Sequence, residues 1–233
     1  MTRPGDVLRT LVFSFAFYGG TIGYVLAALL AGLFSDAALQ VVVRGWSAYH
    51  RGCARVLLGI RVVIEGPRPQ SPALVALRHE SMFEAIDLPH LLHGPVVFGK
   101  AQLLDIPGWG RVARLYGIVP VERDQGARAL RAMIAAARSY EGSGRHYAIF
   151  PEGTRVPHGT APPLQAGFAG LYKLLALPVV PVAIDSGPLY HRRWKRPGTI
   201  RVRFGEQIPA GLPRAEIEAR VHAGIGELNG PEA

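Results

Sequence analysis

Residues 61–228 alternate between short runs rich in β-branched residues and longer segments with helical periodicity. The runs predict strands at 61–65, 73–77, 96–98, 118–121, 147–150, 179–184 and 199–204. The longer segments predict helices at 82–92, 108–116, 125–141, 167–175 and 213–228. Such alternation is typical of an α/β domain whose mostly parallel sheet is covered by helices on both faces. Because ligands of such sheets bind at the carboxyl ends of the strands, chemistry is expected in the segments that follow them.

The region before this domain is apolar. No charged residue occurs between Leu11 and Phe34, and at about 1.5 Å per residue this stretch is long enough to cross a hydrocarbon core of roughly 30 Å. Its glycines predict either a bend or the close packing of a second helix. The next segment, 37–60, mixes apolar and basic residues with Trp46 and Tyr49. That pattern fits a helix in the headgroup plane and, equally, an amphipathic helix packed on the domain.

These features predict an N-terminal, membrane-associated helical region at 1–60 and a separate domain at 61–233. The anchor is expected to be monotopic or single-span. Arginines on both sides of the apolar stretch leave its orientation open. Cys53 is the single cysteine, which excludes an internal disulfide and indicates a cytosol-facing domain. We therefore expect the cytoplasmic face of a membrane, the inner membrane in a bacterium.

The chain is strongly basic. Its 26 Lys and Arg against 17 Asp and Glu give a net charge of +9, and its mean hydropathy is +0.18. A basic, apolar-leaning chain indicates an anionic partner, either a membrane surface or nucleic acid. Residues 192–196 form a basic run around Trp194, but no nucleic-acid recognition motif accompanies it. We expect membrane lipid or an acidic carrier protein as the partner, and no nucleic acid.

Four short segments follow one another along the α/β domain. They are Arg78–Glu84 (RHESMFE), Gly117–Arg123 (GIVPVER), Phe150–Arg155 (FPEGTR) and Val179–Val182 (VVPV). In the first, Ser81 and Glu84 form a Ser-x-x-Glu capping box, which by itself accounts for the carboxylate. Residues five apart do not share a helix face, so a contact between His79 and Glu84 requires the histidine to fold back from the preceding loop. The carboxylate would then accept the Nδ1 proton and leave Nε2 to act as a base.

The order and spacing of these segments resemble the 1-acylglycerol-3-phosphate (lysophosphatidic acid) acyltransferase family over residues 60 to 205. The family's His-x-x-x-x-Asp motif has Glu84 in place of Asp here, and Arg78 stands where Asn is usual. The resemblance implies a glycerol-3-phosphate acyltransferase-like fold, with 61–233 as the catalytic domain and His79 as the base. It also implies acyl-CoA or acyl carrier protein as co-substrate, and no cofactor. The chain lacks a Gly-x-Ser-x-Gly nucleophile elbow, which agrees with direct transfer.

The resemblance also assigns phosphate-binding residues. Arg123 would hold the acceptor's phosphate, although by its neighbours alone it is equally a surface cation. Lys100 follows a predicted strand and is a second candidate. In the third segment, Gly153 permits a tight turn whose backbone N–H groups face an anion. Thr154 and Arg155 lie on this turn as substrate contacts.

Glu152, in the same turn, would orient Arg155 or Arg123, or accept a hydrogen bond from the glycerol. The alternative is a turn closed by a Glu–Arg ion pair. Val179–Val182 is apolar, and we expect it to be structural or to line the acyl channel. His90 and His93 stand three apart, but no further ligand has convincing spacing, so no metal is expected.

The predicted reaction is acyl transfer to lysophosphatidic acid, which gives phosphatidic acid in phospholipid biosynthesis. Gln165 stands where the family often has Lys, which leaves the acceptor open. One alternative is another lyso-lipid, such as a lyso-ornithine lipid. The other is a non-catalytic, lipid-binding protein of the membrane surface.

Overall fold

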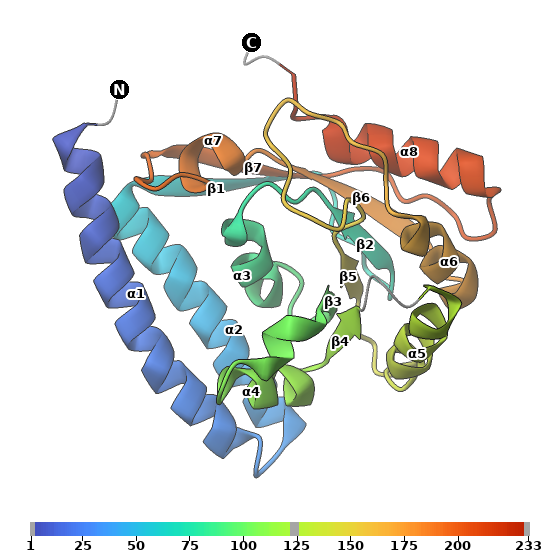
Figure 1. Cartoon of the computed structure of the whole chain (residues 1–233), viewed down its shortest axis with the longest axis horizontal. Helices are drawn as coiled ribbons and strands as arrows, with labels where there is room; N and C mark the ends of the chain where they lie inside the picture. The colour runs from blue at the N-terminus through green and yellow to red at the C-terminus, as the bar shows by residue number, and fades with distance from the viewer. Residues whose placement is uncertain (1–2, 122–125, 231–233) are drawn as a thin grey trace.

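The sheet has seven strands in the computed structural model, which describes residues 3–121 and 126–230 (Figure 1). The strands are β1 (Ile60–Glu65), β2 (Leu74–Leu77), β3 (Val96–Lys100), β4 (Ile118–Val121), β5 (Tyr147–Ile149), β6 (Val179–Ile184) and β7 (Gly198–Phe204). Their order is β1-β7-β6-β2-β5-β3-β4. Every neighbouring pair is parallel except β6 and β7. The predicted mostly parallel α/β fold is confirmed, and the carboxyl ends of β6, β2, β5, β3 and β4 meet at one edge.

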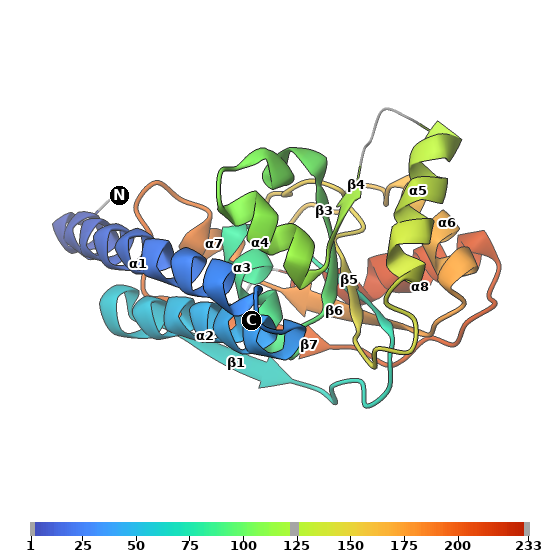
Figure 2. The ribbon, with the colours of Figure 1, turned by 90° about the horizontal axis from the view of Figure 1, so that it is seen from below.

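Helices cover both faces of this sheet (Figure 2). They are α1 (Pro4–Ala31), α2 (Asp36–Cys53), α3 (Met82–Leu91), α4 (Trp109–Tyr116), α5 (Gly126–Arg138), α6 (Ala166–Leu175), α7 (Gly187–Tyr190) and α8 (Arg214–Gly226). Alternate residues of β2 point to opposite cores: Val75 and Leu77 pack with α3, and Leu74 and Ala76 pack with α6 and α8. The five helices predicted after residue 61 are present. The short α7, a π-helical turn at Ala54–Leu58 and a 3₁₀ turn at Ala101–Asp105 are additions.

The first two helices lie side by side. Tyr49 Oη donates to the carbonyl of Ala16 at 2.7 Å, and Trp46 Nε1 donates to Thr21 Oγ1 at 3.0 Å. A Cβ at Gly20 would lie 2.6 Å from the Tyr49 ring, so this glycine permits close helix packing, while α1 continues unbroken to Ala31. On its other side α2 packs on α3, where Ser47 Oγ donates to the carbonyl of Ile86 at 2.8 Å. The segment 37–60 is therefore chiefly a packed amphipathic helix.

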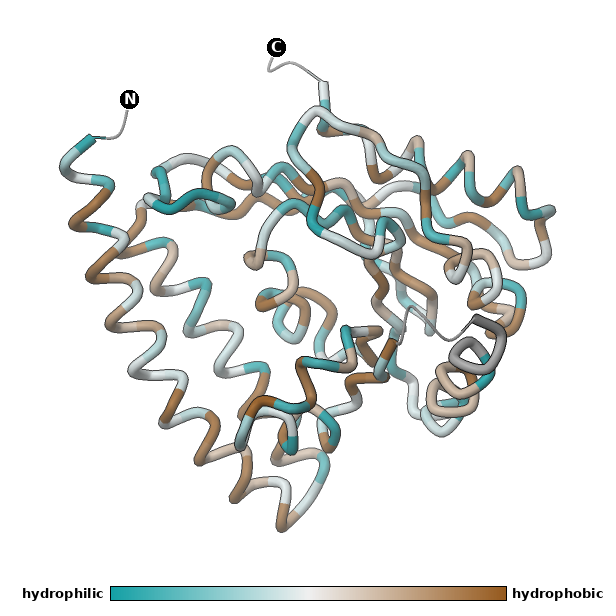
Figure 3. The backbone as a smooth tube through the Cα atoms, in the orientation of Figure 1, coloured by the Kyte–Doolittle hydropathy of each residue, from teal (hydrophilic) through white to brown (hydrophobic). Residues whose placement is uncertain are grey.

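Apolar residues occur along the length of α1 (Figure 3), and those on one face are exposed. The exposed residues recur every three or four positions: Leu8, Leu11, Phe15, Tyr18, Ile22, Leu26 and Leu30. Phe15 is 86% exposed. By length and composition the 28-residue α1 is able to cross a membrane. A continuous apolar stripe of this kind on the surface of a protein marks contact with a membrane or a partner.

Candidate active site

His79 lies in the short loop between β2 and α3. Its Nδ1 is 3.0 Å from Glu84 Oε1, and its ring stacks on Phe150, with the ring centroids 4.0 Å apart. The side chain is 15% exposed. The Glu84 contact fixes the tautomer that carries its proton on Nδ1, and no residue in the described part of the chain hydrogen bonds to Nε2. This is the arrangement that lets Nε2 accept a proton from a bound hydroxyl.

Glu84 makes both kinds of contact predicted for it, to the helix cap and to the histidine ring. Its Oε1 accepts the backbone N–H groups of Glu80 and Ser81 at 2.6 and 2.5 Å, in addition to the His79 ring. Its Oε2 accepts the hydroxyls of Ser81 and Ser186 at 2.9 and 2.6 Å. Burial favours a higher pKa for Glu84, but the hydrogen bonds from His79, Ser186 and Ser81 hold its pKa below the ordinary value. The carboxylate beside the histidine is therefore ionised at neutral pH.

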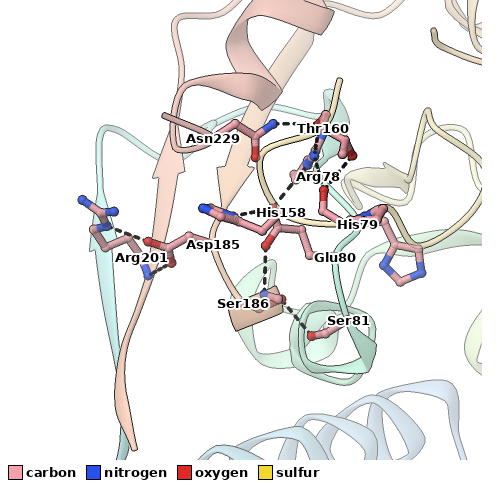
Figure 4. Close-up of polar contacts among 12 residues, drawn as sticks. Arg78, His79, Glu80, Ser81, His158, Thr160, Asp185, Ser186, Arg201 and Asn229 are labelled. Atoms are coloured by element: carbon pink, nitrogen blue, oxygen red, sulfur yellow. Dashed lines mark hydrogen bonds and ion pairs between the residues drawn. The ribbon is translucent and has the colours of Figure 1, made fainter. Parts of the chain in front are cut away.

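Arg78 connects the histidine loop to the turn after β5. The arginine is buried, with 2% of its surface exposed. Its Nη1 donates to Glu152 Oε1 at 2.6 Å, and its Nη2 donates to the carbonyl of Pro157. Nη2 also donates to the carbonyl of Thr160 (Figure 4). Glu152 Oε2 in turn accepts the backbone N–H of His79 at 2.8 Å. A buried guanidinium thus ties together two segments that each carry a predicted site residue.

Two buried carboxylates contact that one buried guanidinium: Glu152, described above, and Glu80, whose Oε1 is 3.5 Å from Arg78 Nε. Glu80 Oε2 accepts the backbone N–H of Gly187 at 2.8 Å, and its Oε1 is 2.9 Å from His158 Nδ1. Burial raises the pKa of Glu80, and it raises the pKa of Glu152 to about 7 although Arg78 opposes the shift. Since Glu80 and Glu152 cannot both ionise around the single charge of Arg78 without a cost, this pair holds a proton near neutral pH.

A cavity of about 1590 Å³ opens in front of His79, larger than the roughly 300–1,000 Å³ common for sites that bind one small molecule. One part is apolar and lies between α1, α2 and α4, where Val25, Leu29, Val43 and Val112 line it. The charged residues described in its lining are Lys100, Arg155, Arg192, Arg193 and Lys195, with no Asp or Glu among them. A long apolar space that meets a cationic rim at a histidine base fits an amphipathic anion.

Comparisons with known proteins decide the family. The acyltransferase family model matches residues 59–185, from the turn before β1 to the end of β6. The 1-acyl-sn-glycerol-3-phosphate acyltransferase of Pseudomonas aeruginosa is 30% identical over 95% of this chain and 90% of its own length. The chain belongs to the acyltransferase family. The human 1-acyl-sn-glycerol-3-phosphate acyltransferase alpha is 27% identical over 89% of this chain and 76% of its own length.

A solved structure supports the same fold. PlsC of Thermotoga maritima, a 1-acyl-sn-glycerophosphate acyltransferase, superposes with a TM-score of 0.76 at 22% identity, covering 98% of this chain and 99% of its own. The family model and the Pseudomonas relative confirm the predicted family and the prediction that the chain is an enzyme. In this acyltransferase the matched segment includes the His79–Glu84 pair and the turn at Gly153.

Most, but not all, of the other predicted site residues that the structure describes line the cavity. Lys100, Gly153 and Arg155 line the cavity, whereas Thr154 is exposed outside the lining. Gly153 has φ 71° and donates its N–H to the carbonyl of Phe150 at 2.9 Å, so this N–H closes the turn. Arg123 lies outside the described residues.

Glu152 differs from its predicted role. Instead of orienting Arg155 or Arg123, or meeting the glycerol, its two oxygens receive Arg78 and the backbone N–H of His79. The acidic side chain is fully buried. The predicted alternative of a Glu–Arg ion pair is present, but its arginine comes from the histidine loop.

Arg78 and Ser186 are among the residues of the site that were not predicted from the sequence. Arg78 stands directly before the histidine, where its departure from the family's Asn was the available signal. Ser186 follows β6, at the same sheet edge as His79, and its hydroxyl holds Glu84 at 2.6 Å. The only feature of the sequence that could have pointed to Ser186 was its position two residues beyond a predicted strand. Among the described residues, no three His, Cys, Asp or Glu side chains gather as metal ligands would.

Proposed function

We propose that this acyltransferase moves a fatty acyl group from an acyl thioester to the free hydroxyl of lysophosphatidic acid, giving phosphatidic acid. The observation that carries the proposal is the His79–Glu84 pair at the point where an apolar cavity meets cations. The names of the Pseudomonas and human relatives support the same acceptor.

The reaction needs one base and no covalent intermediate. Nε2 of His79 takes the hydroxyl proton as the oxygen attacks the thioester carbon. The new C–O bond forms, the C–S bond breaks, and the imidazolium returns its proton to the departing thiolate. Glu84 stabilises the imidazolium between these steps. In this scheme acyl-CoA or acyl carrier protein is a co-substrate, and no cofactor takes part.

Arg155 and Lys100 are proposed to hold the phosphate of lysophosphatidic acid, together with Arg123. Arginine's rigid fork of donors matches phosphate oxygens. Both described cations line the cavity that contains His79. Pairing the phosphate at the rim with the acyl chain in the apolar part places the glycerol hydroxyl between them, beside the base.

The enzyme is proposed to act as a monotopic protein at the cytoplasmic face of the membrane. Because α1 is hydrogen bonded along α2 through Tyr49 and Trp46, crossing the bilayer would require those contacts to break. Lying flat, α1 instead buries its exposed stripe in the interface. Phe15→Asp should lower the fraction of the protein that sediments with lipid vesicles. Glu218→Gln, on the remote α8, is the control and should leave that fraction unchanged. Equal vesicle binding by the Phe15 variant and the parent would contradict this placement.

The acceptor is tested by a thiol-release assay on the purified full chain with palmitoyl-CoA and a panel of lyso-lipids. We expect the fastest transfer to lysophosphatidic acid. Because Gln165 lines the cavity where the family often has lysine, the panel includes lyso-ornithine lipid and lysophosphatidylcholine. Transfer to one of these without transfer to lysophosphatidic acid would overturn the proposed acceptor.

A further inference from the structure

A second group of cations lines the same cavity on the side of α1. Arg192, Arg193 and Lys195 belong to the segment that follows α7. In Figures 1 and 2, α7 lies toward α1, whereas β3 and β5 lie beyond α3. The backbone N–H of Lys195 donates to Thr10 Oγ1 at 2.9 Å, which fixes the segment on α1. These cations therefore reach the cavity from a different direction than Lys100 and Arg155.

None of these three cations has a carboxylate partner within the described part of the chain. Arg192 Nη1 donates to the carbonyl of Pro188 at 3.3 Å, Arg193 lies over the Trp194 ring, and Lys195 Nζ lies 4.7 Å from the centre of the Tyr190 ring. Asp6 lines a smaller adjoining hollow with the arginines. Its carboxylate, however, accepts the backbone N–H of Arg3, and within the described part of the chain it forms no ion pair with Arg192 or Arg193.

Lys195 is the informative member of this group. It is partly buried, and burial lowers its pKa. A charge that has left water without an opposite charge is costly, so the position is one that an anionic ligand stabilises. A flat layer of headgroups outside the protein would meet the exposed arginines. A ligand that enters the cavity meets Lys195 as well.

We propose that Arg192, Arg193 and Lys195 form the donor subsite and bind the phosphate of the phosphopantetheine that carries the acyl thioester. The inference rests on the proposed function, in which two anionic amphipaths must meet at one base. With the acceptor's phosphate at Arg155 and Lys100, the second cationic group is left to hold the donor. The thioester then approaches His79 from the α7 side and the hydroxyl from the β5 side.

The test compares donors with and without phosphate. The variant Arg192→Gln/Arg193→Gln is assayed with palmitoyl-CoA and with the palmitoyl thioester of N-acetylcysteamine, which has no phosphate. We expect the KM for palmitoyl-CoA to rise about tenfold or more through lost charge-assisted hydrogen bonds. The kinetics with the phosphate-free donor and the KM for lysophosphatidic acid should stay unchanged. Lys195→Met should act in the same direction.

The matched control is Arg111→Gln/Arg114→Gln on α4. It removes the same charge from exposed positions outside the cavity lining, so it reports any general effect of charge on binding to the micelle or membrane. A third donor, palmitoyl-acyl carrier protein, identifies the source of the phosphate. A rise in KM for both donors supports the pantetheine phosphate as the ligand, whereas a rise for CoA alone would contradict it and assign the nucleotide phosphates instead.

Three results would overturn the donor subsite: an equal loss with the phosphate-free donor, a raised KM for lysophosphatidic acid with unchanged donor KM, or altered vesicle binding alone. Binding of a non-reactive thioether analogue of palmitoyl-CoA, measured without acceptor, separates this proposal from the proposed function. If the analogue binds the parent and binds the arginine variant about tenfold more weakly, the subsite stands even where lysophosphatidic acid is not the acceptor. Equal analogue binding by both proteins would remove the subsite.

Discussion

Two groups of charged side chains surround His79, and they are built in opposite ways. Behind the ring, both oxygens of each of Glu80, Glu84 and Glu152 accept hydrogen bonds, and Arg78 lies buried among them. In front of it, the cations that line the cavity, such as Arg155, are mostly exposed and have no described carboxylate partner. The charges of the first group are satisfied within the protein, whereas those of the second are available to bind a ligand.

The difference separates positioning from binding. Removing one partner of a buried ion pair leaves an uncompensated charge away from water, so changes behind His79 should alter stability together with turnover. An exposed cation has little effect on the fold, so changes along the rim should alter the KM alone. The experiments below break or sharpen this contrast.

His79→Ala should produce the largest effect. Loss of the base typically lowers kcat by about 10²–10⁴-fold. Because the ring is partly exposed, the variant should keep the melting temperature of the parent. Glu84→Gln should lower kcat less. It removes the charge that stabilises the imidazolium, but it keeps an oxygen that accepts the hydrogen bonds of the helix cap. Single-turnover kinetics with a thermal melt measure both properties. Substantial turnover in His79→Ala would remove this residue from the mechanism.

Arg78→Met should mainly destabilise the protein. Breaking a buried pair typically costs about 3–5 kcal/mol, which denaturant unfolding would detect, and kcat should fall as the His79 loop loosens. Arg78→Lys should restore part of both properties. Arg155→Met is the comparison variant, and its free energy of unfolding should equal that of the parent. Equal stability of the Arg78→Met variant and the parent would show that the arginine does not hold the two segments together.

Arg155→Gln should raise the KM for the lyso-lipid about tenfold with little change in kcat, because one charge-assisted contact to phosphate is lost. Steady-state kinetics over a range of acceptor concentrations separate the two constants. A fall in kcat at an unchanged KM would show that Arg155 positions the site and does not bind the phosphate. It would then belong with the buried group behind His79.

The smallest effect concerns pH. Burial raises the pKa of Glu152 to about 7, so the folded state holds a proton that the unfolded state releases above about pH 4.5. The stability that this proton contributes is present below pH 4.5 and is lost as the pH rises through 7. Urea unfolding from pH 5 to 8 should therefore show falling stability, with a shallower slope in Glu152→Gln. An identical slope in both proteins would contradict the raised pKa.

Local sequence determined most of the secondary structure of this acyltransferase. The β-branched runs became the seven strands, and the helical periodicities became the five later helices, because these patterns depend on neighbouring residues. The sequence likewise indicated His79 and Glu84, whose contact spans five positions next to a capping box. It placed Lys100 and Arg155 in segments that follow predicted strands, at the sheet edge where the cavity lies.

Only the tertiary structure decided how the site is held. The Arg78–Glu152 pair joins residues 74 positions apart, and the Ser186–Glu84 bond spans 102 positions. Both depend on the order β6-β2-β5 in the sheet, which sets side by side the ends of strands that are distant in the chain. Local periodicity carries no information on that order. It also leaves open which face of α1 packs on α2 and which remains apolar and exposed.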